Sequence, residues 1–326
     1  MLTSSIRLLI RASATIKPRI ERGKPMETGA AVNTGHTTAG LGRKKEKMYV
    51  TTIKRLLKNR LAVVGLIIIA IQVLMAIFAP WLATHDPVKQ NLAAAELPAF
   101  SDGHWLGTDN YGRDIWSRIV YGARISLVVG IVSVSLGLIG GVALGLLAGY
   151  YKKLDGLIMR IVDLLFAFPG ILLAMLIIAI LGTGLINVAI AISIWSIPTC
   201  ARIVRGSVLS VKKREYILAM KALGASNARI IIKHILPNCL APIIVFATMR
   251  MATAILSTAS LSYLGLGAQP PTPEWGAMIA AGQAFMWTSP HMTIVPGIAI
   301  MLVVFAFNVV GDGLRDALDP NMDINQ

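Results

Sequence analysis

The chain has 326 residues, of which 55% are hydrophobic and only 14% are charged. Soluble domains carry about 25% charged residues, so this composition excludes an ordinary soluble protein. The high hydrophobic content also excludes disorder over most of the chain. The net charge of +15 could indicate nucleic acid binding, but fourteen of the 31 basic residues precede the first apolar run. We therefore expect a membrane protein with no nucleic acid partner.

Residues 1–47 are polar and basic, and they lack the apolar core of a secretory signal. We expect them to form a disordered cytoplasmic tail. Two alternatives remain open for this segment. Its arginine-rich first 25 residues resemble an organellar transit peptide, and the mature chain could instead begin at Met26 or Met48.

Six apolar stretches follow the tail, and a helix needs about 20 apolar residues to cross a bilayer. The expected spans are 61–82, 125–151, 157–181, 186–205, 239–259 and 293–310. A break at Gly182-Thr183-Gly184 separates the third span from the fourth. The stretches do not alternate as outer-membrane strands do, so the sequence predicts an all-α membrane protein with six transmembrane helices.

The distribution of basic residues predicts the orientation of these spans. If the N-terminus is cytoplasmic, the inner segments hold 26 basic residues and the outer loops hold four. Both termini are therefore expected in the cytoplasm. The predicted organisation is a tail at 1–47, a cytoplasmic segment and first helix at 48–82, an extracytoplasmic loop at 83–124, a five-helix core at 125–311 with a cytoplasmic loop at 206–237, and a cytoplasmic end at 312–326.

The cytoplasmic loop contains a short amphipathic helix. Apolar residues repeat with helical spacing at Ile217, Leu218, Met220 and Leu223. Gly224 is expected to end or turn this helix. Such a helix can lie on the lipid surface or dock into a groove of a soluble partner, and the Ala-Leu-Gly-Ala-Ser turn favours docking.

This loop resembles the conserved cytoplasmic loop of importer permeases of the ATP-binding cassette class. The family pattern is Glu-Ala-Ala, three residues, Gly, nine residues, then Ile-x-Leu-Pro. The matching residues are Ala219, Gly224, Leu236 and Pro237. Departures from the pattern are Leu218, Met220 and His234, which replace the family's Glu, second Ala and Ile.

Three further stretches resemble permeases of the peptide and nickel branch. The first, at the entry to the second span, comprises Leu106–Asp109, Gly112–Asp114, Ser117–Arg118 and Gly122–Leu127. The others are Leu261–Gly276 in the last outer loop and Phe307–Pro320 at the C-terminus. The chain is therefore similar to the C-type permease subunit of a dipeptide/oligopeptide/nickel ATP-binding cassette importer. Leu165–Gly170 and Thr248–Arg250 further resemble the glutathione importers of that group.

The resemblance implies the type I ATP-binding cassette importer permease fold in a bacterial cytoplasmic (inner) membrane. The implied partners are a second homologous permease, two P-loop ATPase subunits, an extracytoplasmic substrate-binding protein and the lipid bilayer. The chain contains no G-x-x-x-x-G-K-[ST] or H-E-x-x-H motif and no Cys/His cluster in its sequence. We therefore expect no enzyme activity, no cofactor and no metal site in this chain, with ATP hydrolysed by the partner subunits.

The implied function is import of di- or oligopeptides. Alternatives are import of glutathione, nickel or another small solute by the same architecture, or a membrane scaffold that works without an ATPase. A membrane enzyme would need clustered ionisable residues within the spans, and only Arg250 lies near the middle of one.

Candidate site residues follow from these expectations. The implied ATPase-coupling residues are Glu215, Tyr216, Ala219, Leu223, Gly224, Ala225 and Pro237. Arg250 lies within the fifth span, where a charge costs about 2.5–3.5 kcal/mol on insertion scales. It could bind a substrate carboxylate in the translocation path, form an internal salt bridge, or extend to the membrane surface.

Two groups of charged residues have more local interpretations. Asp109, Arg113 and Asp114 could contact the binding protein or hold their own loop together. Arg160 and Asp163 are three residues apart, and we expect them to form a local pair on one helix.

Overall fold

The computed structural model describes residues 48–101 and 103–318. The predicted tail at 1–47 and the last eight residues of the predicted cytoplasmic end lie outside the described residues. Within them the chain is helical, and β-structure is limited to two isolated bridges, Ser101 with His104 and Thr108 with Asp114.

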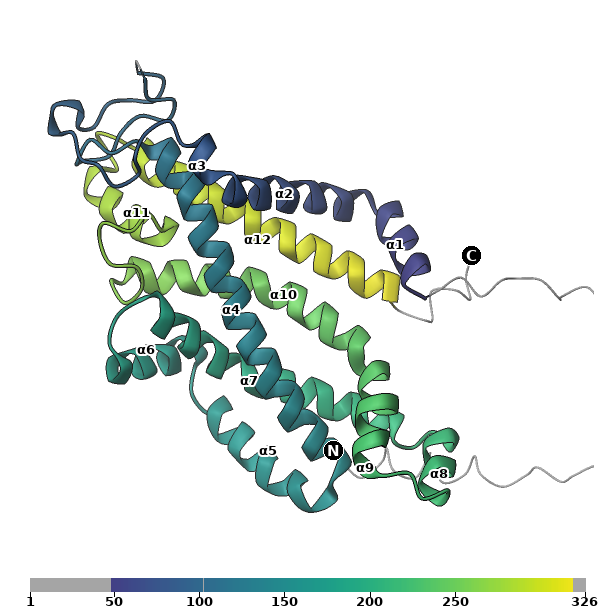
Figure 1. Ribbon diagram of the computed structural model, residues 1–326. Coiled ribbons are helices and arrows are strands. Elements are labelled where there is room, and N and C mark those ends of the chain that lie inside the picture. The colour runs from purple at the N-terminus through teal and green to yellow at the C-terminus, as the bar shows by residue number, and fades with distance from the viewer. Residues whose placement is uncertain (1–47, 102, 319–326) are drawn as a thin grey trace, which may run out of the picture. The chain divides into compact units, whose positions relative to one another are not determined.

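Helices succeed one another along the described chain (Figure 1). Their bounds are α1 (Met48–Lys58), α2 (Arg60–Ile77), α3 (Ala79–Leu82), η1 (Leu92–Ala94), α4 (Ile115–Tyr150), α5 (Lys152–Phe166), α6 (Gly170–Leu181), α7 (Leu185–Val211), α8 (Glu215–Ala222), α9 (Asn227–Arg229), η2 (Ile230–Ile235), α10 (Leu236–Tyr263), α11 (Trp275–Gly282), η3 (Gln283–Phe285) and α12 (His291–Leu318).

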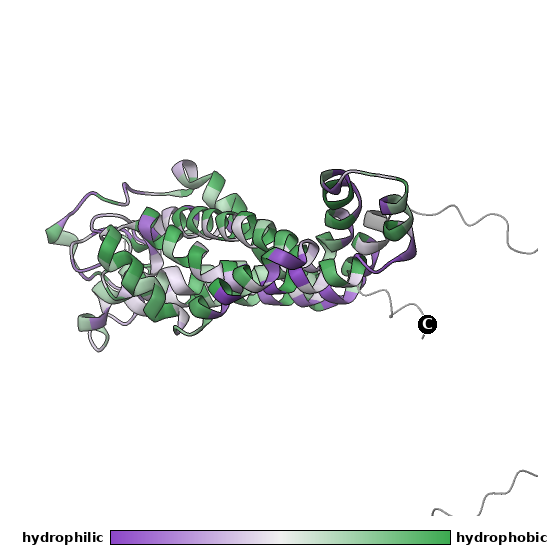
Figure 2. Ribbon diagram, turned by 90° about the horizontal axis from the view of Figure 1, so that it is seen from below, coloured by the Kyte–Doolittle hydropathy of each residue, from purple (hydrophilic) through white to green (hydrophobic). Residues whose placement is uncertain are grey.

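Five helical segments of the described chain are long and apolar enough to cross a membrane. They are α2, α4, α7, the continuous run of α9, η2 and α10, and α12. The bent pair α5 and α6 provides a sixth crossing if it is counted as one span. Hydrophobic residues dominate these long helices (Figure 2). The predicted all-α membrane fold with six crossings agrees with this arrangement.

The third crossing differs from the prediction. The sequence predicts one helix over 157–181, but α5 and α6 are separate helices bent by 91°. Pro169 lies at the break and precedes the first residue of α6. Proline disfavours a helical conformation in the residue before it and removes a backbone N–H, so the helix ends before it.

The predicted Arg160–Asp163 pair is also wrong, because Asp163 pairs with Arg202 of α7, with Oδ1 and Nη2 2.8 Å apart.

Three predicted boundaries also shift. The helix that contains the second predicted span begins at Ile115, ten residues before the predicted start of that span at residue 125. Asp114 starts the helix by accepting a hydrogen bond from the Ser117 N–H at 2.8 Å, as an N-cap residue does. At the other end of the bundle, α7 continues to Val211, and the second helix of the inner loop is continuous with the fifth span through η2.

Close packing of α4 against α7 forms the centre of the bundle. Glycines recur at every fourth residue on the α4 face that meets α7, at Gly137, Gly141, Gly145 and Gly149. A Cβ atom at Gly141 would lie 2.4 Å from the Cβ of Cys200, and one at Gly145 would lie 2.6 Å from the Cβ of Val204. Small residues at such spacing let membrane helices approach closely and gain van der Waals contact.

Candidate functional site

The predicted coupling helix forms α8, which lies at the opposite end of the bundle from the loop before α4 (Figure 1). Ile217 fixes it to the bundle, since this side chain is only 2% exposed and belongs to a buried cluster with residues of α7, η2 and α10. Leu223, at the end of the same helix, is 87% exposed. The element therefore has one anchored side and one apolar side that nothing in the described chain covers.

Gly224 ends α8 as predicted, with a φ of +78°. The Ala225 N–H donates to the Met220 carbonyl and the Gly224 N–H donates to the Lys221 carbonyl, each at 3.1 Å. This pair of bonds is a Schellman motif, which favours glycine because only glycine adopts a positive φ without steric cost. A Cβ at Gly224 would have no atom within 4 Å in this chain. The open space leaves room for close approach by another molecule.

The seven predicted coupling residues lie around this turn and the start of α10. Glu215, Tyr216, Ala219, Leu223 and Gly224 are exposed, whereas Ala225 is half-buried. Pro237 lies in the first turn of α10. Tyr216 reaches that turn, because the Asn238 side-chain amide donates to the Tyr216 hydroxyl at 3.3 Å. The structure thus brings the separate parts of the motif together.

Tyr150 holds this end of the bundle together, and the sequence analysis did not identify it. Its hydroxyl donates to the Asn227 Oδ1 of α9 at 2.7 Å. Its backbone carbonyl accepts a hydrogen bond from Lys212, which follows α7. The Lys212 Nζ also lies 5.2 Å from the centroid of the Tyr150 ring. The ends of α4 and α7 are therefore tied to α9, which follows the Gly224 turn.

Arg250 lies in the middle of α10. Its Nε donates to the Ser196 Oγ at 2.8 Å, and its guanidinium carbon lies 4.8 Å from the centroid of the Trp195 ring. Its Nη2 is buried and has no hydrogen-bond partner among the described residues. No carboxylate in the described part of the chain pairs with it, so the salt-bridge alternative finds no support there.

Polar residues continue from Arg250 along one face of α10. They recur with helical spacing at Thr253, Ser257, Ser260 and Tyr263, and all four are exposed or half-buried in this chain. Polar side chains in a membrane-spanning helix face a protein partner or a water-filled path rather than lipid. Two of these hydroxyls, of Thr253 and Ser260, donate to carbonyls of the same helix, those of Arg250 and Leu256.

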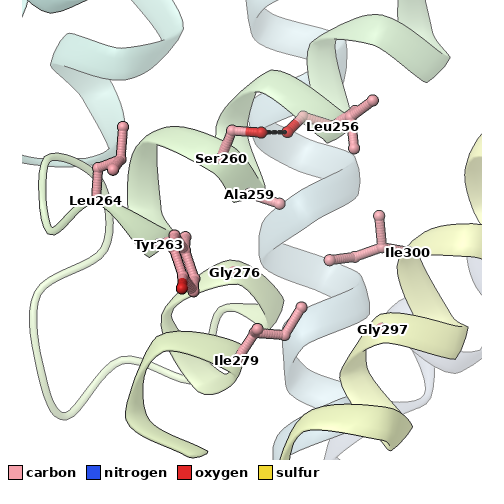
Figure 3. A pocket seen from close by; sticks show the side chains of 9 residues that line it. All are labelled: Leu256, Ala259, Ser260, Tyr263, Leu264, Gly276, Ile279, Gly297 and Ile300. Carbon is pink, nitrogen blue, oxygen red and sulfur yellow. Dashed lines mark hydrogen bonds between the residues drawn. The ribbon is translucent and has the colours of Figure 1, made fainter. Parts of the chain in front are cut away.

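The polar face ends at a cavity of about 460 Å³ between α10, α11 and α12 (Figure 3). Its walls are mainly apolar and are formed by Leu256, Ala259, Ser260, Tyr263, Leu264, Gly276, Ile279, Gly297 and Ile300. The Ser260 hydroxyl donates to the Leu256 carbonyl at 2.9 Å, and the Tyr263 hydroxyl donates to the Gln283 Oε1 at 2.7 Å. The cavity thus offers apolar surface with a few hydroxyl groups and no charged side chain.

The loop before α4 buries Asp109, Arg113 and Asp114. The Arg113 Nε lies 2.7 Å from the Asp109 Oδ2, and the Arg118 Nε lies 3.6 Å from the same oxygen. Arg118 also donates to the Pro271 carbonyl at 3.3 Å. Two of the stretches that resemble the permease family, before the second span and in the last outer loop, therefore meet in space.

Asp114 is 1% exposed. Burial alone would raise the pKa of this carboxyl, but hydrogen bonds from Ser117, His104 and Thr84 bring it below its usual value. The carboxyl group is therefore ionised at neutral pH. Asp109, Arg113 and Asp114 all bond within the loop, which favours their role in holding it together; contact with a binding protein stays a prediction.

Comparisons with known proteins agree with these features. Residues 141–324 match the family described as binding-protein-dependent transport system inner membrane component. Residues 49–99 match the N-terminal transmembrane domain of oligopeptide transport permease C.

Two curated relatives are similar over most of their length. The dipeptide transport system permease protein DppC of Alkalihalophilus pseudofirmus is 54% identical, over 82% of this chain and 88% of its own. The glutathione transport system permease protein GsiD of Pectobacterium atrosepticum is 48% identical, over 82% of this chain and 90% of its own.

A solved structure shares the fold. A chain from inward-facing crystals of the MetNI methionine ABC transporter superposes with a TM-score of 0.52 at 21% identity. The match covers 62% of this chain and 97% of that chain. At this identity the likeness shows a common fold.

Proposed function

Because the chain belongs to the family of binding-protein-dependent transport system inner membrane components, as an importer permease of the ATP-binding cassette class, we propose that it forms half of the translocation pore of a peptide importer. The proposed substrates are di- or oligopeptides. The proposed complex contains a second homologous permease, two P-loop ATPases that hydrolyse ATP, and an extracytoplasmic substrate-binding protein.

The observation that carries the substrate assignment is Arg250. Its cationic side chain lies at mid-span with one buried nitrogen that no described residue bonds. Arginine binds carboxylates through fixed, paired donors, and every unmodified peptide ends in a carboxylate. The polar face of α10 and the cavity beyond it supply hydroxyl groups and apolar surface for the rest of a short peptide.

The proposed coupling element is α8 with the Gly224 turn. The exposed Leu223 and the open space around Gly224 suit insertion into a groove of an ATPase. Closure of the ATPases on nucleotide would push α8, and the Tyr150 and Ile217 contacts would pass that displacement to α4, α7 and α10. This arrangement requires α8 and both termini to be cytoplasmic, in agreement with the distribution of basic residues.

Glutathione is the second candidate substrate, and similarity to GsiD supports it. Glutathione also carries carboxylates that Arg250 could bind. Nickel is disfavoured, because a cation would be repelled by the unpaired guanidinium. A scaffold that works without ATPases remains the alternative outside transport.

Two measurements test the proposal. The first is gentle purification of the full chain from its native membrane, followed by mass spectrometry of the proteins that accompany it. A second permease and two P-loop ATPases are expected, and recovery of the chain alone under detergents that preserve comparable complexes would favour the scaffold.

The second measurement is ATP-dependent uptake into proteoliposomes that contain the purified complex and its binding protein. Labelled dipeptide, labelled glutathione and nickel are offered separately. Saturable uptake of dipeptide is expected. Uptake of glutathione alone would move the assignment to the second candidate, and uptake of nickel alone would overturn the role of Arg250.

A further inference from the structure

Three side chains with metal-binding atoms meet in the loop before α4, although they are far apart in the sequence. His85 follows α3, His104 lies in the isolated bridge with Ser101, and Asp114 caps α4. One ligand atom of each lies within 4.8 Å of the ligand atoms of the other two. The His104 Nδ1 is 2.9 Å from the Asp114 Oδ1, and the His85 Nδ1 is 4.0 Å from the Asp114 Oδ2.

We propose that His85, His104 and Asp114 form a binding site for a divalent transition-metal ion of the zinc class. Two imidazoles and one carboxylate form a ligand set that zinc accepts, with the fourth position left to water or another donor. Zinc binds N and O ligands at about 2.0–2.2 Å, so the ligand atoms of a tetrahedral site lie about 3.4 Å apart. The His104 Nδ1 lies 2.9 Å from the Asp114 Oδ1, whereas the His85 Nδ1 lies 4.0 Å from the other carboxylate oxygen, so His85 must rotate to complete the ligand set.

The carboxylate is already oriented for this role. The Asp114 Oδ2 accepts hydrogen bonds from the Ser117 N–H, the Ser117 hydroxyl and the Thr84 hydroxyl, at 2.8, 2.6 and 3.1 Å. The Asp114 Oδ1 faces His104. Ligating carboxylates in metal sites are commonly held by hydrogen bonds of this kind, which fix their orientation.

The two histidines lie face to face. Their ring centroids are 4.5 Å apart and their planes differ by 28°. The His85 side chain is 44% exposed and the Asp114 side chain is fully buried, so an ion can enter from the His85 side. Rotation of His85 about its side-chain bonds needs no rearrangement of the buried carboxylate.

A cavity of about 350 Å³ adjoins these ligand atoms. It is lined by His85, Asp86, Lys89, Asn91, His104, Gly112 and Asp114. Asp86 and Asn91 add oxygen atoms to its lining, although the Asp86 Oδ1 already accepts hydrogen bonds from the Val88 and Lys89 N–H groups. The cavity leaves room for water in the fourth position of the ion.

The test measures metal binding by the full-length chain, purified with the partners that it retains. The protein is treated with EDTA, returned to buffer, and titrated with zinc chloride or with cobalt chloride. We expect one equivalent of bound zinc per chain and the intense visible absorption of tetrahedral cobalt. His85→Gln and His104→Gln should each weaken zinc binding at least about 10-fold, since loss of a mere supporting contact already costs 10–100-fold.

His234→Gln is the matched control. It also removes one histidine, but from η2 at the other end of the bundle, and it should leave zinc binding unchanged. Asp114→Asn is less informative because Asp114 also caps α4. His85→Gln changes an exposed side chain and should leave the fold intact, which the elution volume of the complex checks.

Two outcomes would overturn the proposal. Equal zinc binding by the native chain and both loop variants would place the ion elsewhere. Absence of saturable binding by a folded native chain would leave the histidines as hydrogen-bonding residues of the loop. Metal binding is measured without transport, so either outcome leaves the proposed function standing.

Discussion

Arg250 carries a charge in the middle of a membrane-spanning helix, and no carboxylate of the described chain compensates it. A charge at this depth costs about 2.5–3.5 kcal/mol on insertion scales, and such residues face protein or water. Ser196 and Trp195 stabilise part of the guanidinium by a hydrogen bond and a cation–π contact. Its Nη2 is buried without a hydrogen-bond partner among the described residues, and the proposed partner is a substrate carboxylate.

Arg250→Gln should raise the KM for dipeptide uptake by about 10-fold or more, because a hydrogen bond to a charged group contributes about 1.5–3 kcal/mol. The change should be much smaller for a dipeptide amide, which lacks the carboxylate. Arg202→Gln is the control, since its pair with Asp163 is exposed on both sides and contributes little. An unchanged KM for the free dipeptide would contradict the proposal that Arg250 binds substrate in the translocation path.

Gly224 requires a left-handed conformation, but its surroundings in this chain are open. Gly224→Val should leave the six crossings inserted and abolish coupled transport, because the valine disfavours the turn by about 1–2 kcal/mol and fills the docking surface. Gly224→Asn separates the two effects, since asparagine tolerates a positive φ but adds bulk. Uptake and ATP hydrolysis by the reconstituted complex are the measurements.

Each result for Gly224 has a distinct meaning. Loss of coupling in both variants would show that the partner approaches the backbone closely, whereas loss in the valine variant alone would show that conformation is the requirement. Gly206→Val, at an equally open position within α7, is the control for added volume. Full transport by Gly224→Val would contradict the proposed docking of this turn to an ATPase.

Tyr150 connects whole elements rather than single residues. Its hydroxyl bonds α9, its carbonyl accepts a hydrogen bond from Lys212 after α7, and its own backbone ends α4. The run from α9 through η2 into α10 is continuous, and η2 has the wider π-helical turn that is frequent at functional sites. A displacement of α8 and α9 can therefore reach α4, α7 and α10 together.

Tyr150→Phe should raise the number of ATP molecules hydrolysed per peptide imported, while the complex still assembles. The variant loses one hydrogen bond between α4 and α9, which contributes about 0.5–1.5 kcal/mol. Asn227→Ala should have the same effect, and the double variant should add nothing further. Tyr151→Phe is the control, because the described contacts of Tyr151 are made by its ring. Additive effects of the two changes would contradict a shared bond.

At the scale of the whole molecule, the end that carries the loop before α4 is held by buried polar contacts as well as by apolar packing. Trp275 is completely buried and donates from its Nε1 to the Ile119 carbonyl at 3.1 Å. Next to it, Glu274 is 1% exposed and caps α11 by accepting from the Ala277 N–H at 3.0 Å. Burial raises the pKa of Glu274 more than its hydrogen bonds lower it.

This raised pKa makes overall stability depend on pH. The folded state holds the Glu274 proton more strongly than the unfolded state, so its contribution is complete below the unfolded pKa and is lost as pH rises through the folded pKa. Glu274→Gln should therefore raise the Tm of the purified complex at pH 8 relative to the native protein, and the difference should shrink towards pH 4.5. Asp316→Asn, which changes an exposed carboxylate outside the proposed sites, should leave the Tm unchanged at both pH values. A Glu274→Gln variant that is less stable at pH 8 would contradict the prediction.

The long apolar helices and the position of the Gly224 turn could be predicted because both depend on local patterns. Apolar runs define the spans, and glycine at the end of an amphipathic segment defines the turn. The bend at Pro169 could not, since a proline within an apolar run is compatible with a kinked helix as well as with a broken one. The loop cluster of His85, His104 and Asp114 has no characteristic spacing, so only the folded loop reveals it. The contact of Tyr150 with Asn227 likewise joins residues 77 positions apart.

The break between α5 and α6 has a consequence for how the protein is made. At 1.5 Å per residue the 15 residues of α5 extend about 22 Å and the 12 residues of α6 about 18 Å, whereas the hydrocarbon layer is about 30 Å thick. Neither half can leave the translocon as a complete crossing. Gly170 lies against Trp195 of α7, where a Cβ would come within 1.7 Å of the indole ring. We therefore expect the bent pair to be stable in the bilayer only when α7 packs against it, so that α5, α6 and α7 would insert together.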